Sequence, residues 1–117
     1  MAKKILIIDD DKHVVEYMVS LLNDNGYETC MASTGAAGIE TAQAEKPDLI
    51  TLDLEMPEGW GTTLYRKLKK DEALKDIPVI IISGLEERPA ATEKIDNYLS
   101  KPFDRDELLK IIKNAIG

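Results

Sequence analysis

Four short apolar runs, each followed by polar or charged residues, limit the possible folds of this chain more than any other feature. Runs this rich in β-branched residues, without polar alternation, are typical of strands buried on both faces of a parallel sheet. The carboxyl ends of parallel strands share one edge, where open α/β sheets bind ligands. We therefore expect the side chains after the runs to converge. The runs are residues 5–8, 49–52, 77–82 and 98–99, and the residues after them include Asp9, Asp10, Asp53, Ser83 and Lys101.

Segments with helical spacing alternate with these runs. Residues 12–24 place their apolar side chains on one helical face. Asp11 is suited to cap the start of this helix, and Gly26 is suited to a left-handed turn at its end. The remaining expected elements are an outer strand at 27–32, helices at 33–45, 62–70 and 103–116, and a loop at 57–61.

The alternation of strands and helices predicts the fold class. Five β-α repeats argue for an α/β fold, a doubly wound five-stranded parallel sheet with helices on both faces. Right-handed crossovers leave few topologies, and we expect the flavodoxin-like strand order 2-1-3-4-5. This order places the first and third strands side by side at the switch point. Those two strands carry Asp9, Asp10 and Asp53, so the expected topology and the expected site agree.

Length, charge and composition exclude several function classes. The 117 residues suit one domain with one core, and the net charge of −7 argues against direct nucleic-acid binding. Cys30 is the only cysteine and His13 the only histidine, so zinc sites and Cys–His nucleophile pairs lack the necessary residues. No apolar stretch is long enough to insert in a membrane, and the N-terminus does not resemble a signal peptide. We expect a cytoplasmic protein.

The three carboxylates Asp9, Asp10 and Asp53 predict a metal site. Gathered within a few ångströms they repel one another, which is costly without a cation. Mg²⁺ suits such a site because it takes one or two carboxylates together with waters and phosphate oxygens. Glu55, two residues after Asp53, is placed to add a backbone carbonyl. Asp11 is better explained as the helix cap than as a ligand.

Ser83 and Lys101 are expected to face the same site. Alone, a serine after a strand is an ordinary turn residue, and a lysine before a proline is an ordinary surface charge. Beside carboxylates, the hydroxyl can donate to a phosphoryl oxygen, and the ammonium can pair with a carboxylate or a phosphoryl group. Pro102 fixes the backbone after Lys101, although the sequence does not reveal whether the bond between them is cis.

Taken in order, these segments resemble the receiver domain of two-component response regulators, in its single-domain, chemotaxis-regulator-like form. The resemblance covers nearly all of residues 1–117, and we expect one receiver domain without an output domain in this chain. It implies a phosphoacceptor, not an enzyme in the usual sense, that works with a histidine kinase or histidine phosphotransfer protein and a downstream protein target. The segments that carry it are residues 5–11, 52–57 with Gly61, 80–84 and 98–103.

The resemblance also implies a role for each site residue. Asp53 would accept the phosphoryl group, while Asp9, Asp10, Asp53 and the backbone carbonyl of Glu55 would hold Mg²⁺. Ser83 and Lys101 would bind phosphoryl oxygens. Tyr98 would be the aromatic switch that turns inward when Ser83 moves toward the phosphate. The alternative for Tyr98 is an ordinary aromatic side chain on an edge strand.

The sequence departs from the family between Ser83 and Lys101. This interval is shorter than usual by roughly one helical turn, and it contains Pro89, which limits where a helix can begin. We therefore expect a shortened or irregular fourth helix within residues 85–97. That expectation puts the family's usual output surface in doubt, but it leaves the phosphorylation site unaffected.

Two rival functions deserve comparison. Haloacid-dehalogenase-like phosphatases also form an aspartyl phosphate with Mg²⁺, but they need a second aspartate two residues after the nucleophile, where this chain has Glu55. A degenerate receiver would act as an interaction module without phosphorylation. The presence of all the required side chains argues against it. Nucleotide binding through a P-loop is unsupported because no glycine-rich loop with Lys-Ser/Thr is present.

Overall fold

A five-stranded parallel sheet with the order β2-β1-β3-β4-β5 forms the centre of the molecule. The computed structural model describes residues 2–56, 60–84 and 97–117, with the side chain of Trp60 left aside. This order confirms the flavodoxin-like topology expected from the sequence. The strands are β1 (Lys4–Ile8), β2 (Glu28–Ala32), β3 (Leu49–Asp53), β4 (Val79–Ser83) and β5 (Tyr98–Ser100).

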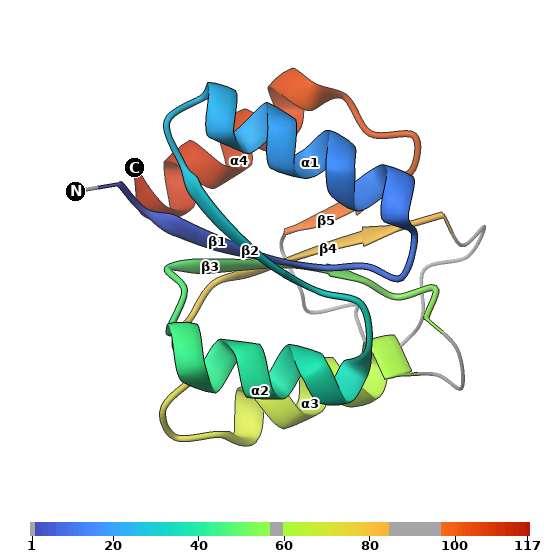
Figure 1. The fold of residues 1–117 in the computed structure, drawn as a ribbon, viewed down its shortest axis with the longest axis vertical. Coiled ribbons are helices and arrows are strands. Elements are labelled where there is room, and N and C mark those ends of the chain that lie inside the picture. The colour runs from blue at the N-terminus through green and yellow to red at the C-terminus, as the bar shows by residue number, and fades with distance from the viewer. Residues whose placement is uncertain (1, 57–59, 85–96) are drawn as a thin grey trace.

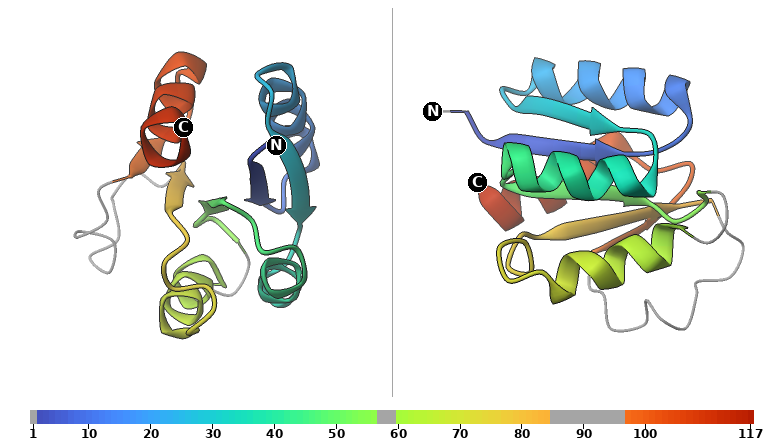
Figure 2. Two further views of the ribbon diagram at one scale, coloured as in Figure 1. Left: turned by 90° about the vertical axis from the view of Figure 1, so that its left-hand side faces the viewer. Right: turned by 60° about the horizontal axis from the view of Figure 1, so that its bottom comes forward.

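Helices cover both faces of the sheet. Figure 1 shows α1 and α4 on one face and α2 and α3 on the other, and Figure 2 shows the same three layers from two further directions. Both chain ends lie beyond the edge where the strands begin, which leaves the opposite edge to the site. The helices of the described residues are α1 (Lys12–Asp24), α2 (Gly35–Glu45), α3 (Trp60–Lys70) and α4 (Arg105–Ile116).

Local sequence signals set the ends of these helices. The side chain of Asp11 accepts hydrogen bonds from the backbone N–H groups of His13 and Val14, at 2.9 Å and 3.4 Å, so its expected role as the cap of α1 is confirmed. Asp104 caps α4 in the same way. Gly26 follows α1 with a φ of 86°, the left-handed conformation that glycine adopts without steric cost.

Alternate residues of the strands supply two apolar cores, one on each side of the sheet. In β1, Leu6 and Ile8 pack under α2 and α3, while Ile5 and Ile7 pack under α1 and α4. All four side chains are at most 1% exposed. Burial on both faces explains why the strand has no polar alternation. It also fixes the position of Asp9, the residue directly after the strand.

The prediction of a loop at 57–61 is wrong at its C-terminal end, because α3 already begins at Trp60. Gly61 is therefore a helical residue, and its backbone lies against Leu54. A Cβ atom at Gly61 would stand 2.5 Å from Leu54 Cα and 2.7 Å from Leu54 O, so only glycine fits there. The glycine that indicated a loop is required instead by close approach of two backbones.

Other expected boundaries differ from the structure by one or two residues, as is usual for helix and strand ends. The expected shortened or irregular fourth helix lies in residues 85–97, and all of these but Asn97 are outside the described residues. None of the helices in the described ranges is long and apolar enough to cross a membrane.

Candidate functional site

The expected acidic cluster forms at the carboxyl ends of β1 and β3, the two neighbouring central strands. Asp9 and Asp53 are 4% and 3% exposed, whereas Asp10 lies open to solvent. One carboxylate oxygen from each of the three residues lies within 4.8 Å of the other two. The strand order thus brings together residues more than forty positions apart in the chain.

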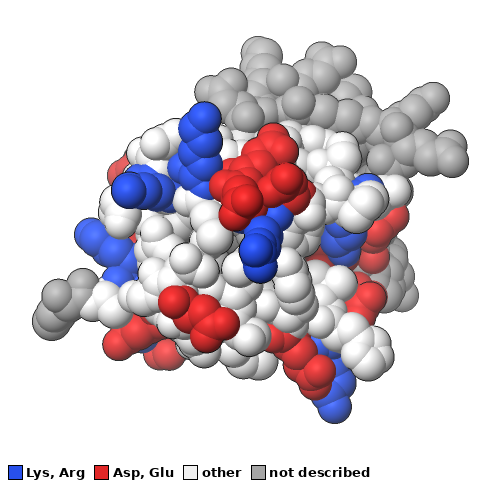
Figure 3. All heavy atoms as spheres, turned by 90° about the horizontal axis from the view of Figure 1, so that it is seen from above, with Lys and Arg blue, Asp and Glu red and all other residues white. Residues whose placement is uncertain are grey.

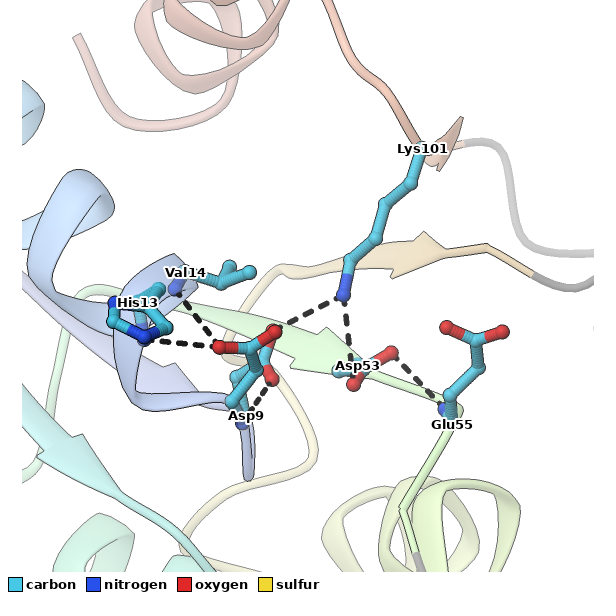
Figure 4. Close-up of polar contacts among 7 residues, drawn as sticks. Asp9, His13, Val14, Asp53, Glu55 and Lys101 are labelled. Atoms are coloured by element: carbon cyan, nitrogen blue, oxygen red, sulfur yellow. Dashed lines mark hydrogen bonds and ion pairs between the residues drawn. The ribbon is translucent and has the colours of Figure 1, made fainter.

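Backbone hydrogen bonds hold the two buried carboxylates in place (Figure 4). Asp9 Oδ1 accepts from the N–H of Asp11 at 2.8 Å, and Asp53 Oδ1 accepts from the N–H of Glu55 at 3.0 Å. Each aspartate therefore uses one oxygen to brace the turn that follows its strand. The second oxygen of each remains directed toward the site.

Lys101 reaches into the site from the end of β5 and contacts both of those second oxygens. Its Nζ lies 3.3 Å from Asp9 Oδ2 and 3.6 Å from Asp53 Oδ2. The bond between Lys101 and Pro102 is cis, the isomer that the sequence left open. A partly buried ammonium group thus lies between the two buried carboxylates, where it offsets part of their repulsion.

The environment changes the protonation of both partners. Burial raises the pKa of Asp53 to about 6, with a further contribution from Asp9, although the Glu55 N–H and Lys101 oppose the rise. For Lys101, burial favours the neutral amine, but Asp53 and Asp9 outweigh that effect and raise its pKa. At neutral pH the site therefore holds a charged lysine beside an aspartate that is predominantly ionised but destabilised in that form.

These residues fit a hard divalent cation. Three carboxylates face one ammonium group, so the cluster retains an excess of negative charge. Their oxygens are the ligand type that Mg²⁺ prefers, and their spacing lets one ion contact more than one of them. The acidic cluster is typical of the Mg²⁺ site of receiver domains. The backbone carbonyl of Glu55, expected as a further ligand, belongs to the turn that Asp53 braces.

Ser83 and Tyr98 belong to β4 and β5, the two strands on the Lys101 side of the sheet. Ser83 ends β4, is fully buried and pairs with Ser100 of β5. Tyr98 lies opposite Ile81 and packs, half-buried, against the core under α2 and α3. β5 is the edge strand of the sheet, so both interpretations of Tyr98, switch and edge aromatic, fit its position. Its switching role stays a prediction.

Two features of the site were not expected from the sequence. The side chain of Glu55 lies over Gly84, the residue after β4. A groove of about 560 Å³ adjoins Lys101, and Tyr17 and Phe103 pair within it at 6.2 Å between ring centres. In the sequence, only the apolar residues of α1 indicated part of this groove. Its lining consists of His13, Val14, Tyr17, Lys101, Pro102 and Phe103.

The groove lies beside α1, which supplies His13, Val14 and Tyr17 to its lining. From the side of α1 and α4, a broad uncharged area separates groups of acidic and basic side chains (Figure 3). Tyr17 is 50% exposed there and is one of two large apolar residues that stand out on the described surface. An exposed aromatic residue beside Lys101 is a feature that partner binding would explain.

Comparison with known proteins identifies the family. The profile of the response regulator receiver domain matches residues 5–113. Protein Rrf1 of Nitratidesulfovibrio vulgaris is 32% identical over 117 residues, which cover 100% of this chain and 85% of that protein. The polar-differentiation response regulator DivK of Brucella ovis is 30% identical over 121 residues, covering 100% of this chain and 98% of DivK.

Solved structures give the same result. The CheY-like response regulator receiver domain protein of Methanospirillum hungatei superposes with a TM-score of 0.90 at 28% identity, covering 99% of this chain and 94% of that one. Chemotaxis protein CheY4 of Vibrio cholerae gives 0.87 at 25% identity, covering 98% and 99%. These matches indicate a two-component signalling domain rather than a classical enzyme, which removes the phosphatase alternative. The chain belongs to the response regulator receiver domain family.

Proposed function

We propose that this protein is a phosphoacceptor in a two-component phosphorelay, and that Asp53 takes a phosphoryl group from a phosphohistidine. One observation carries the proposal. Asp53 is a buried, destabilised carboxylate whose Oδ2 lies 3.6 Å from the ammonium of Lys101, beside two further carboxylates. The donor is a partner histidine kinase or histidine phosphotransfer protein, as membership of the family implies.

The step is an in-line displacement. An ionised oxygen of Asp53 forms a bond to phosphorus while the bond from phosphorus to the imidazole nitrogen breaks. The electron pair stays with that nitrogen, which then takes a proton. Phosphoryl transfer of this kind needs positioning and charge stabilisation more than covalent help. Lys101 supplies one positive charge, and the fixed orientation of Asp53 supplies the positioning.

Asp9, Asp10, Asp53 and the Glu55 carbonyl are the residues that would hold Mg²⁺. The chemistry that a bound Mg²⁺ supplies is neutralisation of charge on the phosphoryl oxygens. Asp9 also keeps Lys101 oriented through the contact at 3.3 Å. Asp9 and Asp53 both contact Lys101, so loss of either carboxylate should affect the cation and the lysine together.

Phosphorylation would change the contacts of Ser83 and Lys101. The product has a charge of about −1.5 to −2 and more acceptor oxygens than the carboxylate that it replaces. Lys101, which now pairs with Asp9 and Asp53, would gain a stronger partner. The Ser83 hydroxyl would donate a hydrogen bond to the same phosphoryl group. The inward turn of Tyr98 would then alter a binding surface. A downstream protein target would read that surface.

The donor protein would approach along the groove between α1 and the segment after β5. Asp53 is 3% exposed, so a phosphohistidine can reach it only if the donor contacts the rim of the site. Lys101 lines both the site and the groove, and Tyr17 and Phe103 supply exposed aromatic surface beside it. The groove is therefore the surface that we assign to the donor, in the cytoplasm, where such kinases act.

Labelling with acetyl phosphate tests the proposal. The protein should gain one acid-labile phosphoryl group in the presence of Mg²⁺, detected by intact mass spectrometry and mapped to Asp53. Asp53→Asn should remove the label, and Asp9→Asn should slow its appearance. A label on Asp11 or Glu55 would overturn the assignment. No labelling by acetyl phosphate or by any tested kinase would favour the degenerate receiver, which binds its partner without phosphorylation.

A further inference from the structure

A second cavity adjoins the acidic cluster on the β2 side of the sheet, whereas the groove that holds Tyr17 and Phe103 lies on the β5 side. It has a volume of about 460 Å³, within the range of small-molecule sites. Figure 1 shows that α1 and α2 both start at the edge where β1 and β2 end, and the cavity lies between these two starts. Asp9 and Asp10 of the acidic cluster belong to its lining.

Part of the cavity lining is apolar. Val15 of α1, Met31 of β2 and Ala37 of α2 supply it. Met31 is 53% exposed, although a large apolar side chain is more stable when covered. A methionine side chain is flexible and polarizable, so it can adapt to the shape of a ligand. A molecule with an aliphatic or aromatic body would cover this surface.

The polar part of the cavity is acidic, and its charge is not fully balanced. Asp9 Oδ2 already lies 3.3 Å from Lys101 Nζ. Asp10 is exposed, and its carboxylate has no hydrogen bond or ion pair with any residue that the structure describes. Lys12 is the basic residue of the described lining, and its Nζ lies 4.0 Å from Glu16 Oε1, one turn further along α1. The charge of the cavity therefore suits a cation and disfavours an anion.

We propose that this cavity binds a small organic ammonium ion. The ammonium group lies at Asp10, and the aliphatic or aromatic body packs on Val15, Met31 and Ala37. Such a ligand complements the unbalanced charge and covers the exposed apolar surface at the same time. An inorganic cation would use only the first of these two features, and a neutral apolar molecule only the second.

The ammonium ion would compete with Mg²⁺, because both bind the Asp10 carboxylate. Two cations close to one carboxylate repel each other, so each lowers the affinity of the protein for the other by the same factor. The ligand should therefore oppose Mg²⁺ binding and, through it, phosphorylation of Asp53. This effect on phosphorylation rests on the proposed function, whereas binding of the ligand does not.

An NMR titration of the full chain with phenethylamine, in metal-free buffer at constant ionic strength, tests the proposal. The resonances of Val15, Met31 and Ala37 should shift together and saturate, with a Kd of about 1–10 mM for so small a ligand. Phenethyl alcohol has the same body without the charge, and methylammonium has the charge without the body. Each should bind at least about fivefold more weakly. Equal binding of phenethylamine and phenethyl alcohol would overturn the proposal.

Two substitutions at exposed residues test the two parts of the cavity. Asp10→Asn should weaken phenethylamine binding about fivefold, because it removes the charge that the ammonium group meets. Asp11→Asn is the matched control, since the Asp11 side chain caps α1, and its Kd should stay within about twofold of the wild type. Met31→Ser should weaken binding by about three- to tenfold through lost apolar contact. Unchanged binding in both Asp10→Asn and Met31→Ser would overturn the assignment.

Tyr17→Ala distinguishes this cavity from the groove on the β5 side. Tyr17 lines that groove and not the cavity, so its truncation should leave the Kd for phenethylamine unchanged. Loss of binding in Tyr17→Ala, with shifts confined to the groove, would place the amine there and overturn the proposal.

Titration in the presence of Mg²⁺ tests the competition. At ten times its own Kd, Mg²⁺ should raise the apparent Kd of phenethylamine about tenfold. An apparent Kd that is insensitive to Mg²⁺ would contradict the shared use of Asp10 and overturn the proposal. If Asp53 is labelled by acetyl phosphate but phenethylamine does not shift the cavity resonances, this inference fails and the proposed function stands. If phenethylamine binds in the cavity but no label appears, the proposed function fails and this inference stands.

Discussion

The backbone N–H of Lys101 donates a hydrogen bond to the carbonyl oxygen of Ser83 at 2.7 Å. This bond extends the pairing of β4 and β5 by one residue beyond Ser100. The two residues expected to hold the phosphoryl group are thus joined through their backbones, although 18 positions separate them in the chain. A shift at the C-terminal end of β4 would therefore also move the backbone of Lys101, from which its side chain extends into the site.

Lys101→Met should destabilise the metal-free protein. The substitution leaves Asp9 and Asp53 buried without their shared cation, at a cost of about 1–3 kcal/mol when allowance is made for the partial exposure of the lysine. Mg²⁺ should restore part of the lost stability because it replaces the missing positive charge. Urea unfolding in EDTA and then in Mg²⁺ measures both effects. Equal losses in the two conditions would contradict the assignment of Lys101 to the metal-site charge balance.

The raised pKa of Asp53 predicts a specific pH dependence in the absence of metal. The folded protein holds a proton on Asp53 up to about pH 6, whereas the unfolded chain releases it near 3.8. The native state therefore binds more protons between these values, and the contribution of Asp53 to stability is lost as the pH rises through this window. Asp53→Asn should be more stable than the wild type at pH 7 by about 1–3 kcal/mol, with the difference vanishing near pH 4. Paired urea titrations across this range would show a constant difference if the pKa were unshifted.

Mg²⁺ should raise the unfolding free energy of the wild-type protein, because it binds the native cluster and not the unfolded chain. The gain is about 2.7 kcal/mol at a hundredfold excess over the Kd. Asp10→Asn should raise the metal-free stability yet remove most of the Mg²⁺ effect, as measured by thermal melting. Asp11→Asn is the matched control, since it removes a neighbouring charge while asparagine still caps α1. A Mg²⁺ effect of equal size in both variants would place the ion elsewhere.

Tyr17→Ala should separate the two kinds of phosphodonor. Truncating an exposed aromatic residue at an interface costs about 1–2 kcal/mol, so transfer from the cognate kinase should slow by about five- to thirtyfold. Labelling by acetyl phosphate should change by less than about twofold, because that donor has no interface to lose. Tyr65→Ala is the control, since Tyr65 lies on α3, on the opposite face of the sheet from the groove. Equal loss of kinase transfer in both variants would argue against the groove.

Gly61→Ala should be the most damaging glycine substitution in the described chain. The new Cβ would stand 2.5 Å from the backbone of Leu54, which cannot move without disturbing the turn after Asp53. We expect a loss of about 2–3 kcal/mol in urea unfolding. Gly38→Ala is a useful comparison, since the nearest atoms there are the side-chain ends of Leu64 and Ile8, at 3.0 Å and 3.1 Å, which can adjust. A smaller loss at Gly61 than at Gly38 would contradict this account of the close approach.

The sequence predicted the sheet well because each signal was local. β1 is buried on both faces, so its apolar run from Ile5 to Ile8 contains no polar interruption, and the only one in the run of β3 is the buried Thr51. Asp11 and Gly26 mark the ends of α1 through chemistry confined to a few neighbouring residues. The convergence of Asp9 and Asp53 then follows from the strand order, which the right-handed crossover rule almost determines.

The remaining features depend on contacts between distant residues, which no local pattern reveals. Gly61 looked like a loop glycine because its approach to Leu54 requires the folded path of both segments. The pairing of Tyr17 with Phe103 joins α1 to the segment after β5, and the seat of Glu55 on Gly84 joins the ends of two strands. Side-chain periodicity places a residue on a face, but it does not identify what lies opposite.

The two edges of the sheet carry different kinds of constraint. The edge where the strands end holds Asp9, Asp10, Asp53 and Lys101, so a substitution there alters the charge and reactivity of the site. The edge where the strands begin holds turns such as Gly26, with a φ of 86°, and Lys46, with a φ of 45°. An insertion or label at those turns should change the free energy of folding but not the phosphorylation reaction. That edge is therefore the place to attach a fluorophore or an affinity tag.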